Sequence, residues 1–213
     1  YCKKKLMGFH IFPSRRTSSH FTEPYNAILN MRSLVEHMDT SIILDNEAID
    51  EVCRSSLEIE IPSYDSLNHV IAQFVSSSTT SLRFHGRLQL CLTEFRTGLV
   101  PYPRIHFMAG CLAPLTGDVY LPTHQLRKEV RLGLKPFPSK VCDLVSGYAT
   151  CSEPSILEIS HMAFSQKNRL VNIDMDRGKY MQLCLMYRDE NNQIEEINKA
   201  VRDLKLREDI NFV

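Results

Sequence analysis

The chain contains 213 residues, and its 25 basic and 25 acidic side chains give a formal net charge of zero at pH 7. The length allows one large domain or two small ones, and the charge balance gives no reason to expect binding to nucleic acid or to a membrane surface. The seven cysteines form no C-x-x-C pair and the eight histidines do not cluster, which favours a reducing cytosolic setting and argues against a metal site built from side chains.

The first sixty residues alternate between strand and helix patterns. We predict a strand at residues 6–12, a polar loop at 13–21, a helix at 23–38, a buried strand at 41–44 and a helix opened by Asp45. The predicted inward stripes are Ile28, Met31, Val35 and Met38 on the first helix, and Ile49, Val52 and Cys53 on the second. This order of elements is typical of an α/β domain.

Residues 62–84 form the stretch around which the chain is organised. Pro62 and Ser63 favour a helix start, and no side chain between Asp65 and Arg83 carries a formal charge. The stretch is too rich in polar uncharged residues for a membrane span. We therefore predict one long, mostly buried central helix, with an apolar stripe of Leu67, Val70, Ile71, Phe74, Val75 and Leu82.

The second half predicts a smaller α/β unit. A short helix carries Glu94, a strand follows at residues 104–112, a helix at 155–164 and a nearly all-apolar strand at 180–187. A last, amphipathic helix is marked by Ile194, Ile197, Val201 and Leu204. The chain starts at Tyr1 and stops in a strand-like INFV, so we expect it to be a fragment.

Six motifs stand out along the chain: EPYN at 23–26, DNEAI at 45–49, SLRF at 81–84, LTEF at 92–95, VPYPRIHF at 100–107 and DRGKYM at 176–181. Together they resemble the alpha-tubulin family. The resemblance implies the closing part of a Rossmann-like GTP-binding domain (residues 1–61), a central helix (62–84) and a smaller mixed-sheet intermediate domain (85–213). Residues 117–153 exceed the family pattern as a proline-containing, mostly basic insertion, which we interpret as disordered or mis-spliced sequence in preference to a new binding element.

The candidate nucleotide-binding residues combine an aromatic ring with amide groups. Tyr64 offers a flat ring, and Asn46 and Asn68 both donate and accept, a combination that can read the edge of guanine. By resemblance these three contact the base, Ser18 and Ser19 approach the nucleotide, and Glu23 lies near the ribose. There is a structural alternative for each of these residues. Asn46 could assist Asp45 in capping a helix, and Tyr64 could pack in the core. Glu23 could be a first-turn carboxylate that is favoured by the helix dipole.

The resemblance also implies GTP and Mg²⁺ as cofactors. The family's glycine-rich phosphate loop and the residues that help hold magnesium lie upstream of this sequence, and backbone amides of such a loop supply most phosphate binding. We therefore expect the isolated chain to hold a nucleotide weakly or not at all.

Glu94 is the candidate catalytic residue. The matching glutamate of the family helps to activate water at the GTP of a head-to-tail beta-tubulin neighbour, a role that suits a carboxylate. The alternative is an ordinary solvated glutamate in a first helical turn. Cys91 stands where the family has aspartate, and His85 replaces an acid, so we expect a lost helix cap at Cys91 and weaker catalysis and assembly.

The function predicted from the resemblance is an alpha-tubulin-like, GTP-binding structural subunit of microtubules in the cytoplasmic cytoskeleton. Its expected partners are beta-tubulin in a heterodimer and filament, and other tubulin chains laterally. The alternative is a non-catalytic, degenerate interaction protein that binds tubulin or its chaperones without polymerising.

Overall fold

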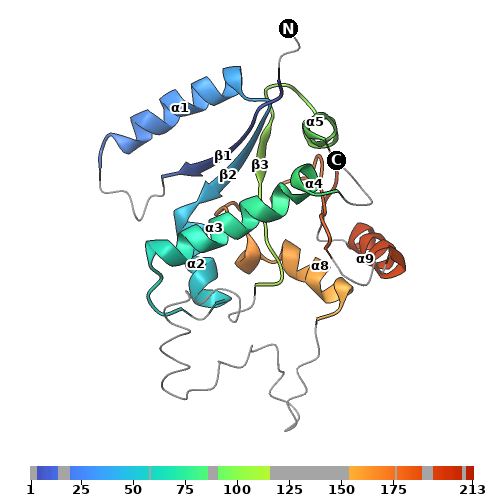
Figure 1. Ribbon diagram of the computed structural model, residues 1–213. Helices are drawn as coiled ribbons and strands as arrows, with labels where there is room; N and C mark the ends of the chain where they lie inside the picture. Colours follow the sequence, from blue (N-terminus) through green and yellow to red (C-terminus); the bar gives the residue numbers. More distant parts are fainter. Residues whose placement is uncertain are drawn as a thin grey trace.

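A three-stranded parallel sheet lies at the centre of the molecule. The computed structural model describes residues 4–13, 20–57, 59–85, 91–115, 154–175, 177–188, 194–207 and 210–213. Its strands are β1 (Met7–Phe12), β2 (Thr40–Asp45) and β3 (Phe107–Ala109), in the order β1-β2-β3 (Figure 1). Phe9 is opposite Ile42, which in turn is opposite Met108. The first two strands confirm the prediction, whereas β3 is much shorter than the predicted residues 104–112.

Helix α2 (Asn46–Ser55) follows β2 directly and anchors the core. Asp45 caps it, since its side chain accepts a hydrogen bond from the Glu47 amide at 3.0 Å. Its inward residues are buried as predicted: Ile49, Val52 and Cys53.

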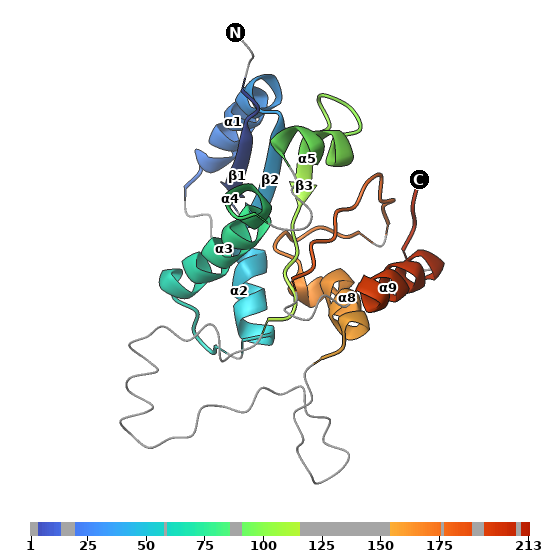
Figure 2. The ribbon, with the colours of Figure 1, turned by 45° about the vertical axis from the view of Figure 1, so that its right-hand side comes forward.

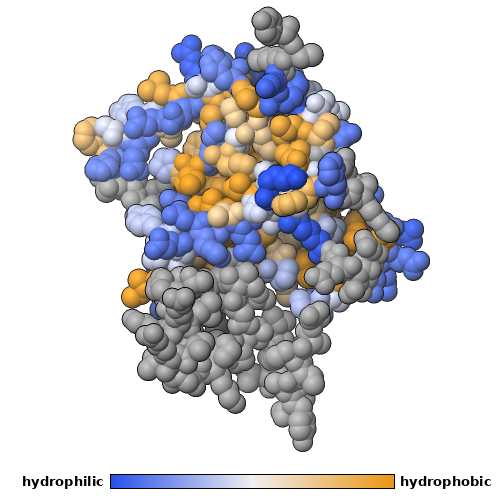
Figure 3. All heavy atoms as spheres, in the orientation of Figure 1, coloured by the Kyte–Doolittle hydropathy of each residue, from blue (hydrophilic) through white to orange (hydrophobic). Residues whose placement is uncertain are grey.

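Helix α1 (Glu23–His37) exists as predicted, but no residue of it is buried. Ile28 is 70% exposed, so its predicted inward place is wrong, while Met31 and Val35 are half-buried. In Figure 1 the helix runs beside β1, away from the helices that cover the sheet's other parts. Figure 3 accordingly shows hydrophobic residues reaching the surface along α1 and over the strands beside it.

The predicted single central helix is wrong in one respect, because it is interrupted. Helix α3 (Tyr64–Ser78) ends at Thr79, and a separate short helix, α4 (Thr80–Arg83), follows. The hydroxyls of Ser78, Thr79 and Thr80 donate to the carbonyls four residues earlier at 2.7, 2.8 and 2.6 Å. Such back-bonding competes with the helical ladder and bends helices. Leu82, beyond the break, is 42% exposed, whereas Leu67, Val70 and Phe74 are buried as predicted.

Segments from both halves of the chain form the hydrophobic core. Phe74 of α3 meets the ring of Phe9 edge-on, with the centroids 6.2 Å apart. Leu170, from far along the sequence, is fully buried among these residues. The core consists of Ile42, Leu44, Ile49, Cys53, Leu57, Leu67, Val70, Phe74 and Leu170.

Residues 168–171 extend the sheet without forming a strand of their own. The Asp45 amide donates to the Leu170 carbonyl at 2.9 Å, and the Leu170 amide donates to the Gly110 carbonyl at 3.0 Å. The ends of β2 and β3 are therefore joined through a segment from the second half. The division of the chain at residues 61 and 84 stays a prediction.

The second half is mostly helical in the described residues. Its helices are α5 (Leu92–Leu99), α8 (Ile156–Phe164), the 3₁₀ turn η1 (Gln166–Asn168) and α9 (Ile194–Leu206), which packs on α8 (Figure 2). The predicted strand at residues 180–187 is wrong, since only Tyr180 forms a bridge, a parallel one to Phe212. With no further backbone partner among the described residues, Met181, Leu183 and Met186 remain exposed. None of the described helices combines the length and apolar character needed to cross a membrane.

Candidate functional site

The carboxyl ends of β1 and β2 form the candidate site. Ligands of open parallel sheets bind outside the carboxyl ends of the strands. β1 and β2 are parallel and end at Phe12 and Asp45. The N-terminal ends of α2 and α3 lie toward this side of the sheet in Figures 1 and 2.

A groove of about 420 Å³ lies between β1 and α1. Glu23 lines it together with three polar residues of the same helix, Asn26, Asn30 and Ser33, and His10 and Phe12 face it from the strand. These groups offer several donors and acceptors and one carboxylate. Because its lining includes no lysine or arginine, the groove as described suits uncharged polar groups better than phosphates.

The side chains at the start of α2 differ in role. Asp45 makes the capping hydrogen bond itself, and burial raises the pKa of its carboxyl group. Asn46 is the first residue of α2 and is half-buried. The capping hydrogen bond seen at this helix is that of Asp45, and the alternative that Asn46 assists it stays a hypothesis.

Tyr64 and Asn68 lie one turn apart on α3 and are both exposed. Tyr64 is 77% exposed, so the alternative that it packs in the core is wrong. The helix cap is made by Ser63, which accepts from the Ser66 amide at 3.4 Å. An exposed ring and an exposed amide on one helix face leave both groups available to a planar base.

The described candidate residues carry groups suited to the nucleoside part of the expected nucleotide. Tyr64, Asn68 and Asn46 are suited to a base, and Glu23 can accept from a hydroxyl. Ser18 and Ser19 lie outside the described residues. The described residues contain no cluster of three or more histidine, cysteine, aspartate or glutamate side chains that could hold a metal ion. A metal site built from three or more such side chains is therefore absent from the described part of the chain.

Glu94 takes part in a capping box at the start of α5. Its carboxylate Oε2 accepts from the Cys91 amide at 3.0 Å, and its own amide donates to Cys91 Sγ at 3.4 Å. The expectation that Cys91 loses the helix cap is therefore wrong, because sulfur is large enough to reach the amide at this longer distance. Both residues are exposed, and α5 is tied to the sheet by Arg96, whose Nη1 lies 3.4 Å from Asp39 Oδ1.

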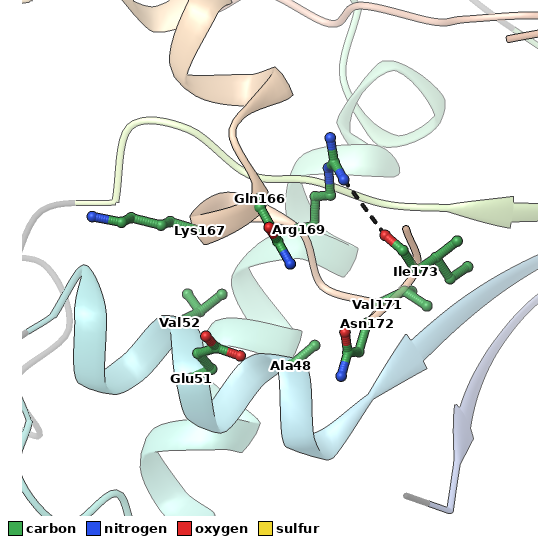
Figure 4. Close-up of a pocket in the computed structure, with 9 residues that line it drawn as sticks. All are labelled: Ala48, Glu51, Val52, Gln166, Lys167, Arg169, Val171, Asn172 and Ile173. Atoms are coloured by element: carbon green, nitrogen blue, oxygen red, sulfur yellow. Dashed lines mark hydrogen bonds between the residues drawn. The ribbon is translucent and has the colours of Figure 1, made fainter. Parts of the chain in front are cut away.

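A second hollow, between α2 and residues 166–173, is too small for a ligand. Figure 4 shows Glu51 and Gln166 on its opposite walls, and Arg169 Nη1 donating to the Ile173 carbonyl at 3.5 Å. The space within it is about 10 Å³, which is room for roughly one water molecule. We assign it no function.

Sequence reasoning missed the polar stripe of the groove. Asn26, Asn30 and Ser33 are spaced by four and three residues, the helical spacing that places side chains on one face. The sequence contains this signal, but its apolar periodicity predicts a different inward face for α1, that of Ile28, Met31 and Val35. The groove lies against the polar stripe and the half-buried Leu34.

Comparison with known proteins supports the α/β fold described above. Residues 1–54 match the family model of the Tubulin/FtsZ GTPase domain, and residues 142–213 match that of the tubulin C-terminal domain. The Tubulin alpha-3 chain of Zea mays and the nucleomorph Tubulin alpha chain of Guillardia theta are each 40% identical over all 213 residues of this chain. The chain spans 41% of the length of each relative. The two matched tubulin domains and the identity along the whole chain confirm the expected α/β class and the resemblance of this chain to alpha-tubulin.

Proposed function

We propose that the chain forms part of an alpha-tubulin-type, GTP-binding subunit of microtubules in the cytoplasmic cytoskeleton. The observation that carries the proposal is the 40% identity to two alpha chains along its whole length. The exposed Tyr64 and Asn68 near the strand ends support a role in nucleotide binding. The partners that follow are beta-tubulin, head to tail, and other tubulin chains laterally.

In this proposal the described residues recognise the nucleoside end of GTP. Tyr64 stacks on guanine, Asn46 and Asn68 bond its edge, and Glu23 accepts from the ribose, with Ser18 and Ser19 close to the nucleotide. Mg²⁺, held from elsewhere in the subunit, would neutralise phosphate charge.

A chimera tests this assignment, in which the N-terminal part of an alpha-tubulin chain precedes residue 1. We expect it to bind GTP and Asn68→Ala to weaken binding about tenfold, since one or two hydrogen bonds to the base are lost. Gln73→Ala is the matched control, because Gln73 is another amide of α3, half-buried and more than one turn further along the helix. Equal affinities of the Asn68 variant and the parent chimera, measured by titration, would contradict the guanine assignment.

The catalytic part of the proposal concerns Glu94. One carboxylate oxygen is held by the Cys91 amide, which fixes the side chain and leaves the other oxygen for a water at a neighbour's GTP. The isolated chain should release no phosphate, and in assembly with beta-tubulin Glu94→Ala should slow hydrolysis about a hundredfold or more. Because the capping box is already formed, Cys91→Asp should change the rate less than about tenfold. A Glu94→Ala subunit that hydrolyses GTP normally would show that Glu94 is only a surface residue.

The second candidate function is a degenerate tubulin-like protein that binds tubulin or its chaperones without polymerising. The exposed apolar side chains near α1 favour it: Phe21 is 87%, Ile28 70% and Tyr25 69% exposed. Co-sedimentation with microtubules separates the two functions. Stoichiometric incorporation supports the first, and exclusion from the polymer despite binding to soluble tubulin supports the second.

A further inference from the structure

Helix α5 turns one face toward the protein and the other toward solvent. Its inward face consists of one buried and three half-buried side chains, in that order Phe95 and then Leu92, Arg96 and Leu99. Along the sequence these are spaced by three, one and three residues, which places them on a single side of a helix. Glu94 lies on the exposed side. Arg96 is therefore the one charged residue on the inward face of α5.

Asp39, directly before β2, is the partner of this charge. Arg96 Nη1 lies 3.4 Å from Asp39 Oδ1, and the two side chains are 33% and 18% exposed. The carboxylate is itself held in place, because Oδ2 accepts from the Leu6 amide at 3.1 Å and the Asp39 amide donates to the Leu6 carbonyl at 3.1 Å. Lys5 Nζ also lies 3.4 Å from Oδ1. Asp39 is thus anchored to the residues before β1 and offers α5 a fixed point of attachment.

Both members of the pair are charged at neutral pH. Burial by itself would raise the pKa of Asp39, but the hydrogen bond from Leu6 and the charges of Lys5 and Arg96 outweigh it, so the pKa lies below its ordinary value. A guanidinium keeps its charge throughout this range. Of the ion pairs between described residues, this is the one that joins α5 to another part of the chain.

The ion pair sets the direction in which Glu94 points. Apolar contacts such as that of Phe95 have no preferred direction, so they alone do not fix how far the helix is rotated about its axis. Successive residues of an α-helix are rotated by about 100°, so Glu94 and Arg96 point about 200° apart. Holding Arg96 on Asp39 therefore turns Glu94 away from the sheet.

The pair lies at the opposite end of the sheet from the candidate nucleotide site. Strand β2 contains six residues and runs from Thr40, next to Asp39, to Asp45. That length is about 20 Å. Figures 1 and 2 both show α5 beside the ends at which the strands begin. Glu94 therefore faces away from the candidate site of its own chain.

We propose that Arg96 is a positioning residue for Glu94: its ion pair with Asp39 sets the rotation of α5 and so presents the Glu94 carboxylate to the GTP of a neighbouring subunit. This inference rests on the proposed function, which gives Glu94 its role. The capping box with Cys91 fixes the glutamate relative to α5, and the ion pair fixes α5 relative to the sheet. Arg96 itself touches no nucleotide and acts only through the helix.

Phosphate release per assembled subunit tests the positioning role, with the full chain assembled with beta-tubulin. Arg96→Met keeps the apolar part of the side chain and removes the charge. We expect it to slow release about tenfold, because a displacement near 1 Å of a reacting group can cost up to about a hundredfold. Arg96→Lys keeps the charge and should recover most of the rate. A variant that only loses stability lowers the amount of polymer and not the rate per assembled subunit, and copolymers with the wild-type chain keep poorly assembling variants measurable.

A mutant cycle with Asp39 shows whether the two residues act as a pair. Asp39→Asn keeps an acceptor for the Leu6 amide but removes the charge, so it should slow release to a similar extent. Adding Arg96→Met to it should then cause no further loss. Arg54→Met is the matched control, because it removes an ion pair with Asp50 of 2.8 Å within α2, and it should leave the rate unchanged.

Glu94→Ala, measured beside these variants, separates the two proposals. If Glu94→Ala slows hydrolysis but Arg96→Met does not, the positioning role is overturned and the proposed function stands. Additive losses in the Asp39→Asn, Arg96→Met double variant, or no recovery in Arg96→Lys, overturn the positioning role as well. If Glu94→Ala leaves the rate unchanged, the catalytic part of the proposed function fails and the positioning role fails with it.

Discussion

At the scale of single residues, three buried polar atoms have no hydrogen-bond partner among the described residues: His10 Nε2, Ser41 Oγ and His106 Nε2. Ser41 and His106 are both 0% exposed. A buried polar atom without a partner costs about 1–3 kcal/mol, and a buried charge costs more. These groups make the sheet sensitive to any change that adds charge near them.

His10 is expected to make the folded chain sensitive to acid. Burial lowers the pKa of His10, and a charge on His106 lowers it further. Since the folded state binds the proton less readily than the unfolded state, the stabilising effect is complete above pH 6.5 and is lost as the pH falls through the folded-state value. The free energy of unfolding from urea titrations should therefore decrease from about pH 7 to about pH 5. In His10→Gln this decrease should be smaller, and an identical decrease in both chains would contradict the assignment.

Two glycines give a matched pair of predictions on packing. A Cβ on Gly110 would lie 2.4 Å from Phe74 Cζ and 2.8 Å from Phe74 Cε2, inside the buried core. Gly110→Ala should lower the free energy of unfolding by about 1–3 kcal/mol, as overpacking does. Gly98, within α5, has no atom within 4 Å of that position, so Gly98→Ala should instead raise stability by about 0.5 kcal/mol. Urea titration of both variants checks the opposite signs.

At the scale of elements, most of the helices and two strands could be predicted because their apolar periodicity agrees with how they pack. The sequence did not predict the break at Thr79, because hydroxyl back-bonding to Val75 depends on side-chain rotamers rather than on pattern. The apolar stretch at 180–187 predicts a strand, yet a strand needs a backbone partner, which the apolar pattern does not reveal. Of the candidate site, the exposed Tyr64 and Asn68 were found, but the polar stripe of Asn30 and its neighbours was not.

The capping box of α5 provides a prediction on local stability. Cys91 Sγ accepts from the Glu94 amide at 3.4 Å, and sulfur is a weaker acceptor than oxygen. Cys91→Asp should therefore stabilise the chain by about 0.5–1 kcal/mol, and Cys91→Ala should destabilise it by a similar amount. The measurement is the midpoint of urea unfolding. If Cys91→Asp and Cys91→Ala unfold at the same urea concentration, the cap of this exposed helix does not contribute to the stability of the whole chain.

At the scale of the whole molecule, distant parts of the chain share one core. Leu170 is 0% exposed and lies among residues of β2, α2 and α3. Its backbone joins the Asp45 amide to the Gly110 carbonyl. A boundary near residue 84 would separate this leucine from the core that it completes, so the described contacts favour one cooperative unit.

Leu170→Ala distinguishes a cooperative unit from two independent ones. The substitution leaves a cavity in the shared core and should lower the free energy of unfolding by about 2–5 kcal/mol. The loss should appear equally in the hydrogen-exchange protection of Leu44 in β2 and Val70 in α3, both 0% exposed and both far from Leu170 in sequence. Leu29→Ala, the same chemical change at a 66% exposed position of α1, should cost less than about 0.5 kcal/mol. A cavity can destabilise only the cooperative unit that contains it. If Leu170→Ala weakens protection only within residues 156–188 and leaves Leu44 and Val70 unchanged, the two halves therefore fold separately. The predicted division of the chain would then hold.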